Sequence, residues 1–229
     1  MNNVIDLMKS HSSVRRFKEE DIKEEDLQAI LTAGQMASSW KNFQSYSIIL
    51  VRSQEKKEAL RQCSVFLLFV GDLNRAEKGV RMHTDQFHPE GPDNLLITSV
   101  DAALAGQNTL LAAESLGYGG VIIGLVRYQA SEVAKLFNLP DYTYPVFGMA
   151  LGVPNQNHPV KPRLPLEAVV FEESYQEQTP EVIEAFDRVQ TAYAGARATD
   201  TWSQRLAAQF GQEEPAATAE LLKKHQLEK

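Results

Sequence analysis

The chain contains almost no cysteine. Among its 229 residues Cys63 is the single cysteine, so neither an internal disulfide nor a cysteine-based metal cluster is possible. Cys63 begins an apolar stretch, and we interpret it as an inert small hydrophobic side chain. The five histidines lack metal-ligand spacing, and no carboxylate pair suggests hydrolysis. We therefore expect no metal and no protein nucleophile, which fits an enzyme whose cofactor performs the chemistry.

Net positive charge and long hydrophobic runs are absent as well. The formal net charge of −7 and the pI near 5.3 argue against a nucleic-acid partner. No apolar run approaches the length of a membrane span. The first residues lack the basic start and apolar middle of a signal peptide. With 43% hydrophobic residues, we expect a globular, cytoplasmic protein that works without a membrane.

The most informative stretch is an Ala- and Leu-rich segment at residues 101–116, followed by a glycine-rich run. Small and apolar residues nearly all round predict a buried helix, and Gly117 is suited to end it. Residues 121–123 then predict a short buried strand, which Gly124 interrupts. A glycine at such a position indicates that another surface comes very close, and a flat ligand would be such a surface.

Apolar periodicity predicts the remaining elements. Helices are expected at residues 3–10, 27–39, 54–61 and 131–138, and strands at 45–51, 65–70 and 145–152. Polar residues 76–92 predict an exposed, mobile excursion, and 153–160 a linker. Beyond residue 174 the chain becomes helical and highly charged without a complete apolar core. We expect this tail to pack on the body or on a second copy of the chain.

Two basic elements stand out in this acidic sequence. The first alternates like an extended segment, which places His11, Ser13 and Arg15 on one face. The second is Lys161 and Arg163, which an extended backbone points the same way. Such cations suit a phosphate dianion, although ordinary solvated surface charges remain the alternative. Neither a phosphate-binding P-loop nor the G-x-G-x-x-G fingerprint is present, so any nucleotide is held in another manner.

A series of short motifs carries a family resemblance. In order they are His11-Ser-Ser-Val-Arg15, Ala37-Ser-Ser39 followed by Gln44-Ser-Tyr46, Asp72-Leu-Asn-Arg75, the segments 101–108 and 113–124, Leu139-Pro140, and Lys161-Pro-Arg-Leu-Pro165. Together they resemble the NADPH-dependent, oxygen-insensitive nitroreductases and flavin reductases of the FMN-binding nitroreductase superfamily. Each motif alone is weak, but the ordered set is specific and spans the whole chain.

The resemblance implies an α+β homodimer with a central mixed β-sheet flanked by helices. It implies an FMN-binding core at residues 1–172 and a C-terminal helical extension at 173–229, with FMN at the dimer interface. The implied cofactor-binding residues are His11, Ser12, Ser13, Arg15, Ser39, Ile123, Gly124, Leu125, Lys161 and Arg163.

Individual roles also follow from the resemblance. The two basic elements would hold the phosphate and ribityl chain, and Arg15 would reach the pyrimidine side. Ser39 would contact the ring from the partner subunit, although such serines more often bond to local backbone groups. The backbone at Gly124 would lie near the reactive flavin N5. Arg197 matches an arginine that receives the 2′-phosphate of NADPH.

The sequence departs from the family pattern at three places. Ser12 stands where a second basic residue is common. A longer Gly/Gln-containing loop that touches the cofactor is missing between residues 61 and 65, so helix and strand there almost meet. A longer loop is also cut short between residues 197 and 202.

The implied activity is a two-step, ping-pong reaction. NADPH would deliver a hydride to the flavin and leave, and a nitroaromatic, a quinone or a free flavin would then take its place. Cations at the pyrimidine edge would stabilise the reduced flavin, and solvent would supply protons. The alternatives are a dedicated reductase that supplies reduced flavin to another protein, and a flavin-binding protein without turnover.

Overall fold

A computed structural model describes residues 3–52, 63–213 and 217–228, so the predicted helix at 54–61 lies outside the described residues. The chain divides into two compact units. The first comprises Met1–His158 and Ala216–Lys229, and the second comprises Pro159–Pro215. The boundary at 172/173 between a cofactor-binding core and an extension stays a prediction.

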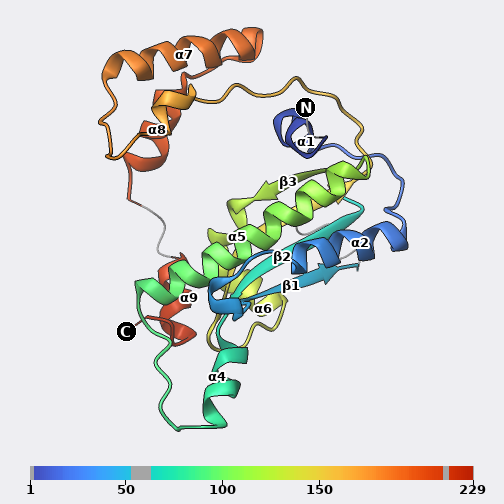
Figure 1. The fold of residues 1–229 in the computed structure, drawn as a ribbon, viewed down its shortest axis with the longest axis vertical. Helices are drawn as coiled ribbons and strands as arrows, with labels where there is room; N and C mark the ends of the chain where they lie inside the picture. Colours follow the sequence, from blue (N-terminus) through green and yellow to red (C-terminus); the bar gives the residue numbers. More distant parts are fainter. Residues whose placement is uncertain (1–2, 53–62, 214–216, 229) are drawn as a thin grey trace. The chain divides into compact units, whose positions relative to one another are not determined.

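The first unit is built on a four-stranded sheet (Figure 1). Its strands are β1 (Tyr46–Val51), β2 (Val65–Asp72), β3 (Gly119–Ile123) and β4 (Thr143–Gly152), in the order β1-β2-β4-β3. All of these pairs are antiparallel, which fits the α+β class but corrects the mixed sheet that the resemblance implied. Strands β2 and β3 do run in the same direction, but β4 separates them, so no parallel pair forms among the described strands.

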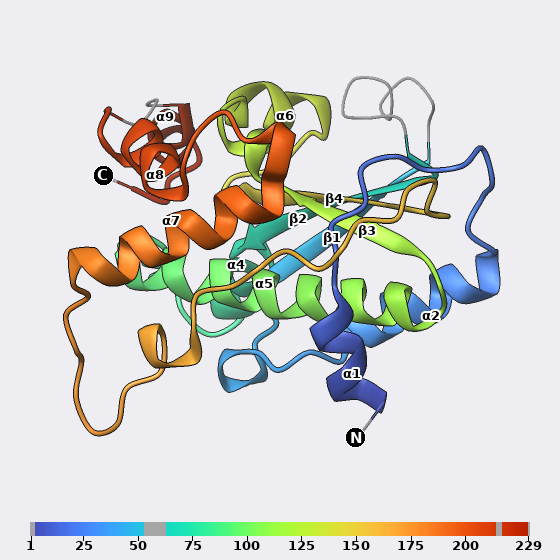
Figure 2. The same cartoon turned by 90° about the horizontal axis from the view of Figure 1, so that it is seen from above.

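The core of this unit lies on both faces of the sheet. Strand β2 is buried from Val65 to Gly71, as the apolar run at 65–70 predicts. Helices α2 (Glu24–Gln35) and α5 (Pro92–Ser115) pack beside each other on one face (Figure 2). A Cβ at Gly34 would collide with the hydroxyl of Thr109, so the glycine lets α2 and α5 approach closely.

Helix α5 differs from its prediction in length and in burial. It begins at Pro92 rather than near residue 101, because a proline fits the first turn of a helix. Its outward side is not buried: the side chains of Leu96, Val100 and Leu104, spaced four residues apart, are 63%, 52% and 42% exposed. The helix therefore has one face in the core and an apolar stripe on the surface of this unit.

Helix α5 also bears on the membrane question. Against the expectation of no apolar run of that length, α5 is long and apolar enough to cross a bilayer by length and composition alone. The core helix of a globular protein passes the same test, and α5 buries Ala102, Ala105 and Ala113 in the main core cluster. Its packing identifies it as a core helix.

The opposite face of the sheet is covered by helix α6 (Ala130–Leu136), and helix α9 (Ala217–Lys224) packs against α6. Leu221, Leu222 and Leu227 join Ala130 and Tyr144 in one buried cluster. The last helix of the chain therefore belongs to the first unit. The second unit contains α7 (Pro180–Ala194) and α8 (Trp202–Phe210), where the rings of Phe186 and Trp202 meet edge to face at 5.1 Å.

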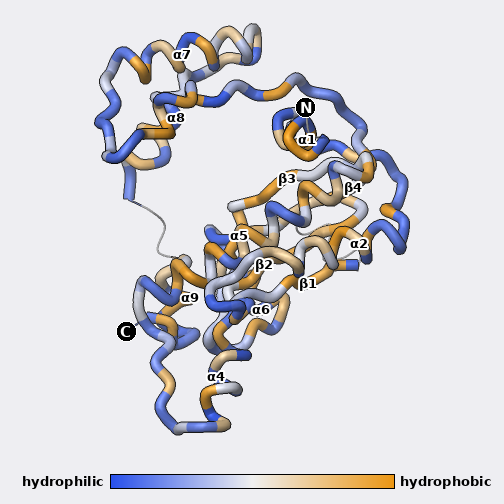
Figure 3. The backbone as a smooth tube through the Cα atoms, viewed as in Figure 1, coloured by the Kyte–Doolittle hydropathy of each residue, from blue (hydrophilic) through white to orange (hydrophobic). Residues whose placement is uncertain are grey.

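Part of the predicted excursion at 76–92 is a helix, α4 (Asn74–Arg81). Asp72 accepts a hydrogen bond from the backbone N–H of Asn74 at 2.9 Å, and Arg81 pairs with Glu77 at 2.8 Å one turn apart. These contacts stabilise a helix that has no apolar periodicity. The mostly hydrophilic loop from residue 82 to 91 follows it, mainly blue in Figure 3.

The remaining elements are short. They are α1 (Asn3–Ser10) and the 3₁₀ turns η1 (Trp40–Asn42), η2 (Gly124–Arg127), η3 (Leu166–Ala168) and η4 (Gly195–Arg197). Helix α1 matches the prediction at 3–10, and its apolar residues Val4, Ile5 and Met8 are about half exposed in this unit.

Candidate functional site

The first basic element is an extended segment that lies against the edge of the sheet. The backbone N–H of Val14 donates to the carbonyl oxygen of Gly120 at 2.9 Å, and Lys18 donates likewise to Val153. Val14 is 7% exposed, whereas its neighbour Arg15 is exposed and Ser13 half-buried. The burial of Val14 beside an exposed Arg15 agrees with an extended segment, but Arg16 is exposed as well, so the common face of His11, Ser13 and Arg15 stays a prediction.

His11 is oriented by a carboxylate that the sequence did not suggest. Its Nδ1 lies 2.5 Å from Oε1 of Glu114 on α5, and the two side chains are 26% and 12% exposed. A partner on one ring nitrogen fixes the ring and leaves Nε2 as the nitrogen for a ligand. Half-buried Ser12 follows directly in the chain.

The second part of the site lies where β3 ends and η2 begins. Ile123 is buried, Gly124 half-buried and Leu125 57% exposed. A Cβ built on Gly124 would stand 3.1 Å from Nη2 of Arg127, so the close surface there is a guanidinium. Arg127 Nη1 also donates to the carbonyl oxygen of Val146 at 2.9 Å. Arg127 is a candidate site residue that the sequence analysis missed.

Strand β3 connects these two parts of the site. Val14 bonds at Gly120, and the strand reaches Gly124 four residues later, a span of about 13 Å. Ile122 on this strand is 46% exposed, so β3 is buried on one face only, which corrects the prediction of a fully buried strand.

Ser39 lies on the loop between α2 and β1, because α2 ends at Gln35 rather than at residue 39. Its Oγ accepts a hydrogen bond from the backbone N–H of Gln44 at 3.1 Å, the local role that serines at such positions often have. A hydroxyl that accepts one bond keeps its hydrogen for donation.

Lys161 and Arg163 belong to the second unit. Both side chains are exposed, and Pro162 between them is held by Gln190 of α7, whose Nε2 donates to the proline carbonyl oxygen at 3.0 Å. Arg163 Nη1 donates to the carbonyl oxygen of Lys161 at 2.7 Å. Arg163 also lines a cavity of about 480 Å³ against α7, with Phe186 among its walls.

Arg197 lies on the turn η4 of the second unit and is exposed. Its guanidinium lies over the ring of Tyr193, with 5.8 Å from Cζ to the ring centroid. The role of Arg197 stays a prediction. Of the two basic elements, His11 to Arg15 belongs to the first unit, and Lys161 with Arg163 belongs to the second.

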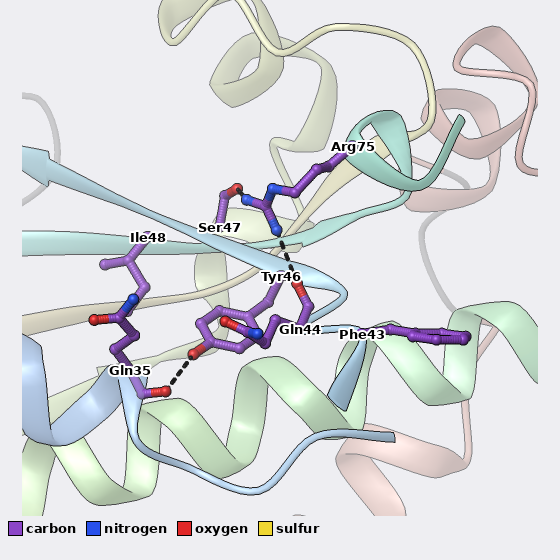
Figure 4. Close-up of a pocket in the computed structure, with 7 residues that line it drawn as sticks. All are labelled: Gln35, Phe43, Gln44, Tyr46, Ser47, Ile48 and Arg75. Atoms are coloured by element: carbon purple, nitrogen blue, oxygen red, sulfur yellow. Dashed lines mark hydrogen bonds between the residues drawn. The ribbon is translucent and has the colours of Figure 1, made fainter. Parts of the chain in front are cut away.

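A further cavity, of about 520 Å³, lies in the first unit beside β1 (Figure 4). Arg75 of α4 donates there to the carbonyl oxygen of Gln44 at 3.0 Å and to Ser47 Oγ at 3.1 Å. The cavity is lined by Gln35, Phe43, Gln44, Tyr46, Ser47, Ile48 and Arg75. The sequence did not predict this cavity, although Gln44, Tyr46 and Arg75 belong to motifs that carry the family resemblance.

In the part of the chain that the structure describes, no group of three or more His, Cys, Asp or Glu side chains is arranged for a metal ion. Burial raises the pKa of Tyr144, and hydrogen bonds from Ser203 lower the pKa of Asp187. Neither residue belongs to the sites described above.

Comparison with known proteins gives these geometries a context. The profile of the Nitroreductase family matches residues 8–64 and 57–153, and that of its C-terminal domain matches residues 161–229. The chain is 38% identical over 220 residues to the NADPH-flavin oxidoreductase of Vibrio harveyi, covering 90% of each protein. It is 35% identical over 224 residues to the oxygen-insensitive NADPH nitroreductase of Salmonella typhimurium, again covering 90% of each.

A solved structure agrees with these relatives. The NADPH:FMN oxidoreductase of Vibrio harveyi complexed with NAD⁺ superposes with a TM-score of 0.90 at 35% identity, over 99% of both chains. The chain belongs to the nitroreductase family, within the branch of NADPH-dependent nitroreductases and flavin reductases. It is accordingly an oxidoreductase.

Proposed function

We propose that the protein is a cytoplasmic, homodimeric, FMN-dependent oxidoreductase that passes reducing equivalents from NADPH to small acceptors by a ping-pong mechanism. Nitroaromatics, quinones and free flavins are the proposed acceptors. The names of the relatives, among them an FMN reductase [NAD(P)H] of Bacillus subtilis that is 35% identical over 228 residues, support FMN and NAD(P)H as its cofactors.

One observation carries the proposal. The extended segment from His11 to Arg15 is tied through Val14 to Gly120 of β3, and that strand ends at Ile123, directly before Gly124. A line of polar and cationic groups therefore lies at one end of β3, and a glycine with little steric bulk lies at the other. This donor set fits a ligand with an anionic end and a flat end.

The residues of this chain would act mainly by binding and orientation. His11, fixed by Glu114, would offer Nε2 to the ribityl phosphate, together with Ser12 and Ser13. Lys161 and Arg163 would add charge-assisted contacts to the same phosphate. Bound FMN would supply the two-electron redox chemistry.

At the flat end of the ligand, main-chain groups and cations would matter most. The backbone of Ile123, Gly124 and Leu125 would line the ring near N5, and Ser39 of the partner subunit would donate to it. Arg15 would place a cation at the pyrimidine edge and favour negative charge there. Solvent would supply the protons, so no described side chain is required to act as a general acid. An open site that both substrates share would discriminate little between acceptors.

A dimer is part of the proposal because of the surface of the first unit. Leu96, Val100 and Leu104 form an exposed apolar stripe on α5, and Val4 and Met8 of α1 are exposed as well. Contiguous apolar surface of this kind is typical of an interface between subunits.

The direct test is an anaerobic titration of the purified holoprotein with NADPH, followed by visible absorbance. We expect the yellow flavin absorbance to bleach with one equivalent of NADPH and to return when an acceptor is added. A flavin that binds but is never bleached would identify a binding protein without turnover. A reduced flavin that is reoxidised only when a second protein is added would identify a dedicated supplier of reduced flavin.

The phosphate assignment makes a sharper prediction. Replacing Lys161 and Arg163 together by alanine removes two charge-assisted contacts, each worth about 1.5–3 kcal/mol. The affinity for FMN should therefore fall by at least about a hundredfold, whereas riboflavin, which has no phosphate, should bind nearly as before. The exposed pair Lys223 and Lys224 provides a control with the same loss of charge. Equal losses for FMN and riboflavin, measured by fluorescence quenching, would refute the assignment.

A further inference from the structure

The loop that carries Ser39 has a strained backbone. Lys41, Asn42 and Gln44 have φ angles of 48°, 59° and 53°, in the left-handed region that residues other than glycine rarely adopt. Asparagine tolerates this region, whereas lysine and glutamine adopt it at an energetic cost. Such a conformation persists only where the surrounding structure determines it.

A buried carboxylate holds this loop at two points. Asp101 of α5 is 1% exposed. Its Oδ1 accepts the backbone N–H of Trp40 at 2.9 Å, and its Oδ2 accepts the backbone N–H of Ser45 at 3.0 Å. One side chain thus bonds both ends of the strained stretch, with the charge-assisted hydrogen bonds that are the stronger kind.

The ends that Asp101 holds determine what the loop presents outward. Ser39, directly before the first of these ends, accepts the N–H of Gln44 at its Oγ, and between the ends Phe43 N–H donates to the carbonyl oxygen of Trp40 at 2.9 Å. The rings of Trp40 and Phe43 meet edge to face at 5.3 Å and are 45% and 60% exposed. Phe43 and Gln44 also line the cavity beside β1, as Figure 4 shows.

We propose that Asp101 is a positioning residue, which imposes the left-handed conformation of the loop at 39–45 and thereby sets the direction of the Ser39 hydroxyl. The consequence for the cofactor rests on the proposed function, in which Ser39 contacts the flavin of the partner subunit. The clamp itself does not depend on that function, so the two statements can fail separately.

The clamp is tested first by the fluorescence of Trp40. The replacement Trp202→Phe leaves Trp40 as the reporter, since the chain has two tryptophans. In this background Asp101→Asn turns one acceptor into an NH₂ donor facing a backbone N–H, so the loop should be released. We expect quenching of Trp40 by acrylamide to rise about twofold, because an indole that is 45% exposed becomes as accessible as that of an unfolded chain.

Thr98→Val is the matched control. Thr98 is also 1% exposed on α5, and its hydroxyl bonds Tyr144 at 2.7 Å rather than the loop. It should lower stability as a buried polar deletion does but leave Trp40 quenching unchanged. Equal quenching in Asp101→Asn and the wild type, or equal increases in both variants, would overturn the clamp.

The link to the cofactor is tested by a double-mutant cycle on FMN affinity with Asp101→Asn and Ser39→Ala. We expect each single change to weaken binding about tenfold, the effect of one hydrogen bond to a ligand. The double variant should bind no more weakly than either single one, because Asp101 acts through Ser39. Additive losses would refute this route. A Ser39→Ala variant with unchanged affinity would instead contradict the proposed flavin contact while leaving the clamp standing.

Amide hydrogen exchange of the unmodified protein tests the clamp even if Asp101→Asn fails to fold. The amides of Trp40 and Ser45 should exchange as slowly as those of α5, and far more slowly than the amide of Lys41. Exchange of all three amides at one fast rate would overturn the proposal.

Discussion

At the scale of single residues, helix α5 supplies two carboxylates that act on other segments. Glu114 bonds His11 of the extended segment, and Asp101 bonds the loop that carries Ser39. Both segments have little regular structure of their own, so they need fixed partners in the core. The rigid helix thereby orients side chains that are proposed to touch one ligand from two subunits.

The coenzyme preference is predicted to depend on Arg197. Its exposed guanidinium can grip the 2′-phosphate by which NADPH differs from NADH. Removing one charged hydrogen bond costs about 1.5–3 kcal/mol, roughly ten- to a hundredfold in an equilibrium constant. Arg197→Ala should therefore raise KM for NADPH by that factor and barely change NADH use or kcat.

Steady-state kinetics with both coenzymes and one fixed acceptor measure this effect. Arg188→Ala, an exposed arginine on α7 of the same unit, is the control for the loss of one positive charge. The prediction is wrong if Arg197→Ala keeps the full preference for NADPH, or if Arg188→Ala loses it equally.

The residues of the candidate site were only partly readable from the sequence. Alternation predicted one shared face for His11, Ser13 and Arg15, because every second side chain of an extended segment points the same way, and this placement stays a prediction. The partners Glu114 and Arg127 were not predicted. Their contacts join residues that lie far apart in the chain or depend on a turn, and a single sequence carries no signal for either.

At the scale of elements, burial was harder to predict than element type. The strand at 65–70 and the helix at 3–10 were predicted at nearly their observed positions. Helix α4 was missed because its stability comes from Asp72 and the Glu77–Arg81 pair rather than from an apolar stripe. The outward face of α5 was predicted to be buried, because its leucines look the same in sequence whether they face a core or a partner.

The docking of α7 on α8 is predicted to weaken in acid. Asp187 of α7 accepts hydrogen bonds from the side chain and backbone N–H of Ser203 at 2.6 and 2.8 Å. These bonds, the side-chain bond first, lower the pKa of Asp187. A group with a lowered folded-state pKa stabilises the fold above its unfolded value of about 3.9, and this contribution disappears as the pH falls through the folded pKa.

Trp202, which precedes Ser203 and contacts Phe186, reports this docking in a Trp40→Phe background. The temperature of the unfolding transition seen by Trp202 fluorescence should fall as the pH is lowered from 6 toward 3. Asp187→Asn should remove most of that pH dependence and should lower the unfolding temperature at pH 6. Glu184→Gln, an exposed carboxylate on the same helix, should leave the shift in place. A shift of the same size in the Asp187→Asn variant would contradict the assignment.

At the scale of the whole molecule, the family resemblance predicted more than the periodicity did. Periodicity located strands and helices but not the sheet order, in which β4 lies between β2 and β3. The expectation that the tail packs on the body or on a second copy left open which part returns. It is α9 that joins the first unit, where Leu221, Leu222 and Leu227 find partners more than seventy residues earlier in sequence. Such long-range pairings are decided by packing, which a local pattern does not contain.

The last prediction concerns assembly. We expect a homodimer whose mass in light scattering is twice the chain mass of 25.6 kDa, with the apolar stripe of α5 at its interface. Leu104, 42% exposed, lies on that stripe. In a twofold interface the substitution Leu104→Asp enters twice and buries two unpaired charges, each costing several kcal/mol, so the dimer should dissociate at micromolar concentration.

The same change tests whether the cofactor site needs both subunits. Because Ser39 is proposed to reach the flavin of the partner, the Leu104→Asp monomer should also bind FMN at least about tenfold more weakly while keeping its circular dichroism. Met82→Asp, at a 79% exposed apolar residue beyond α4, is the control and should remain a dimer with full affinity. A Leu104→Asp protein that stays dimeric would place the interface elsewhere. A monomer that binds FMN as tightly as the wild type would show that one chain suffices to hold the cofactor.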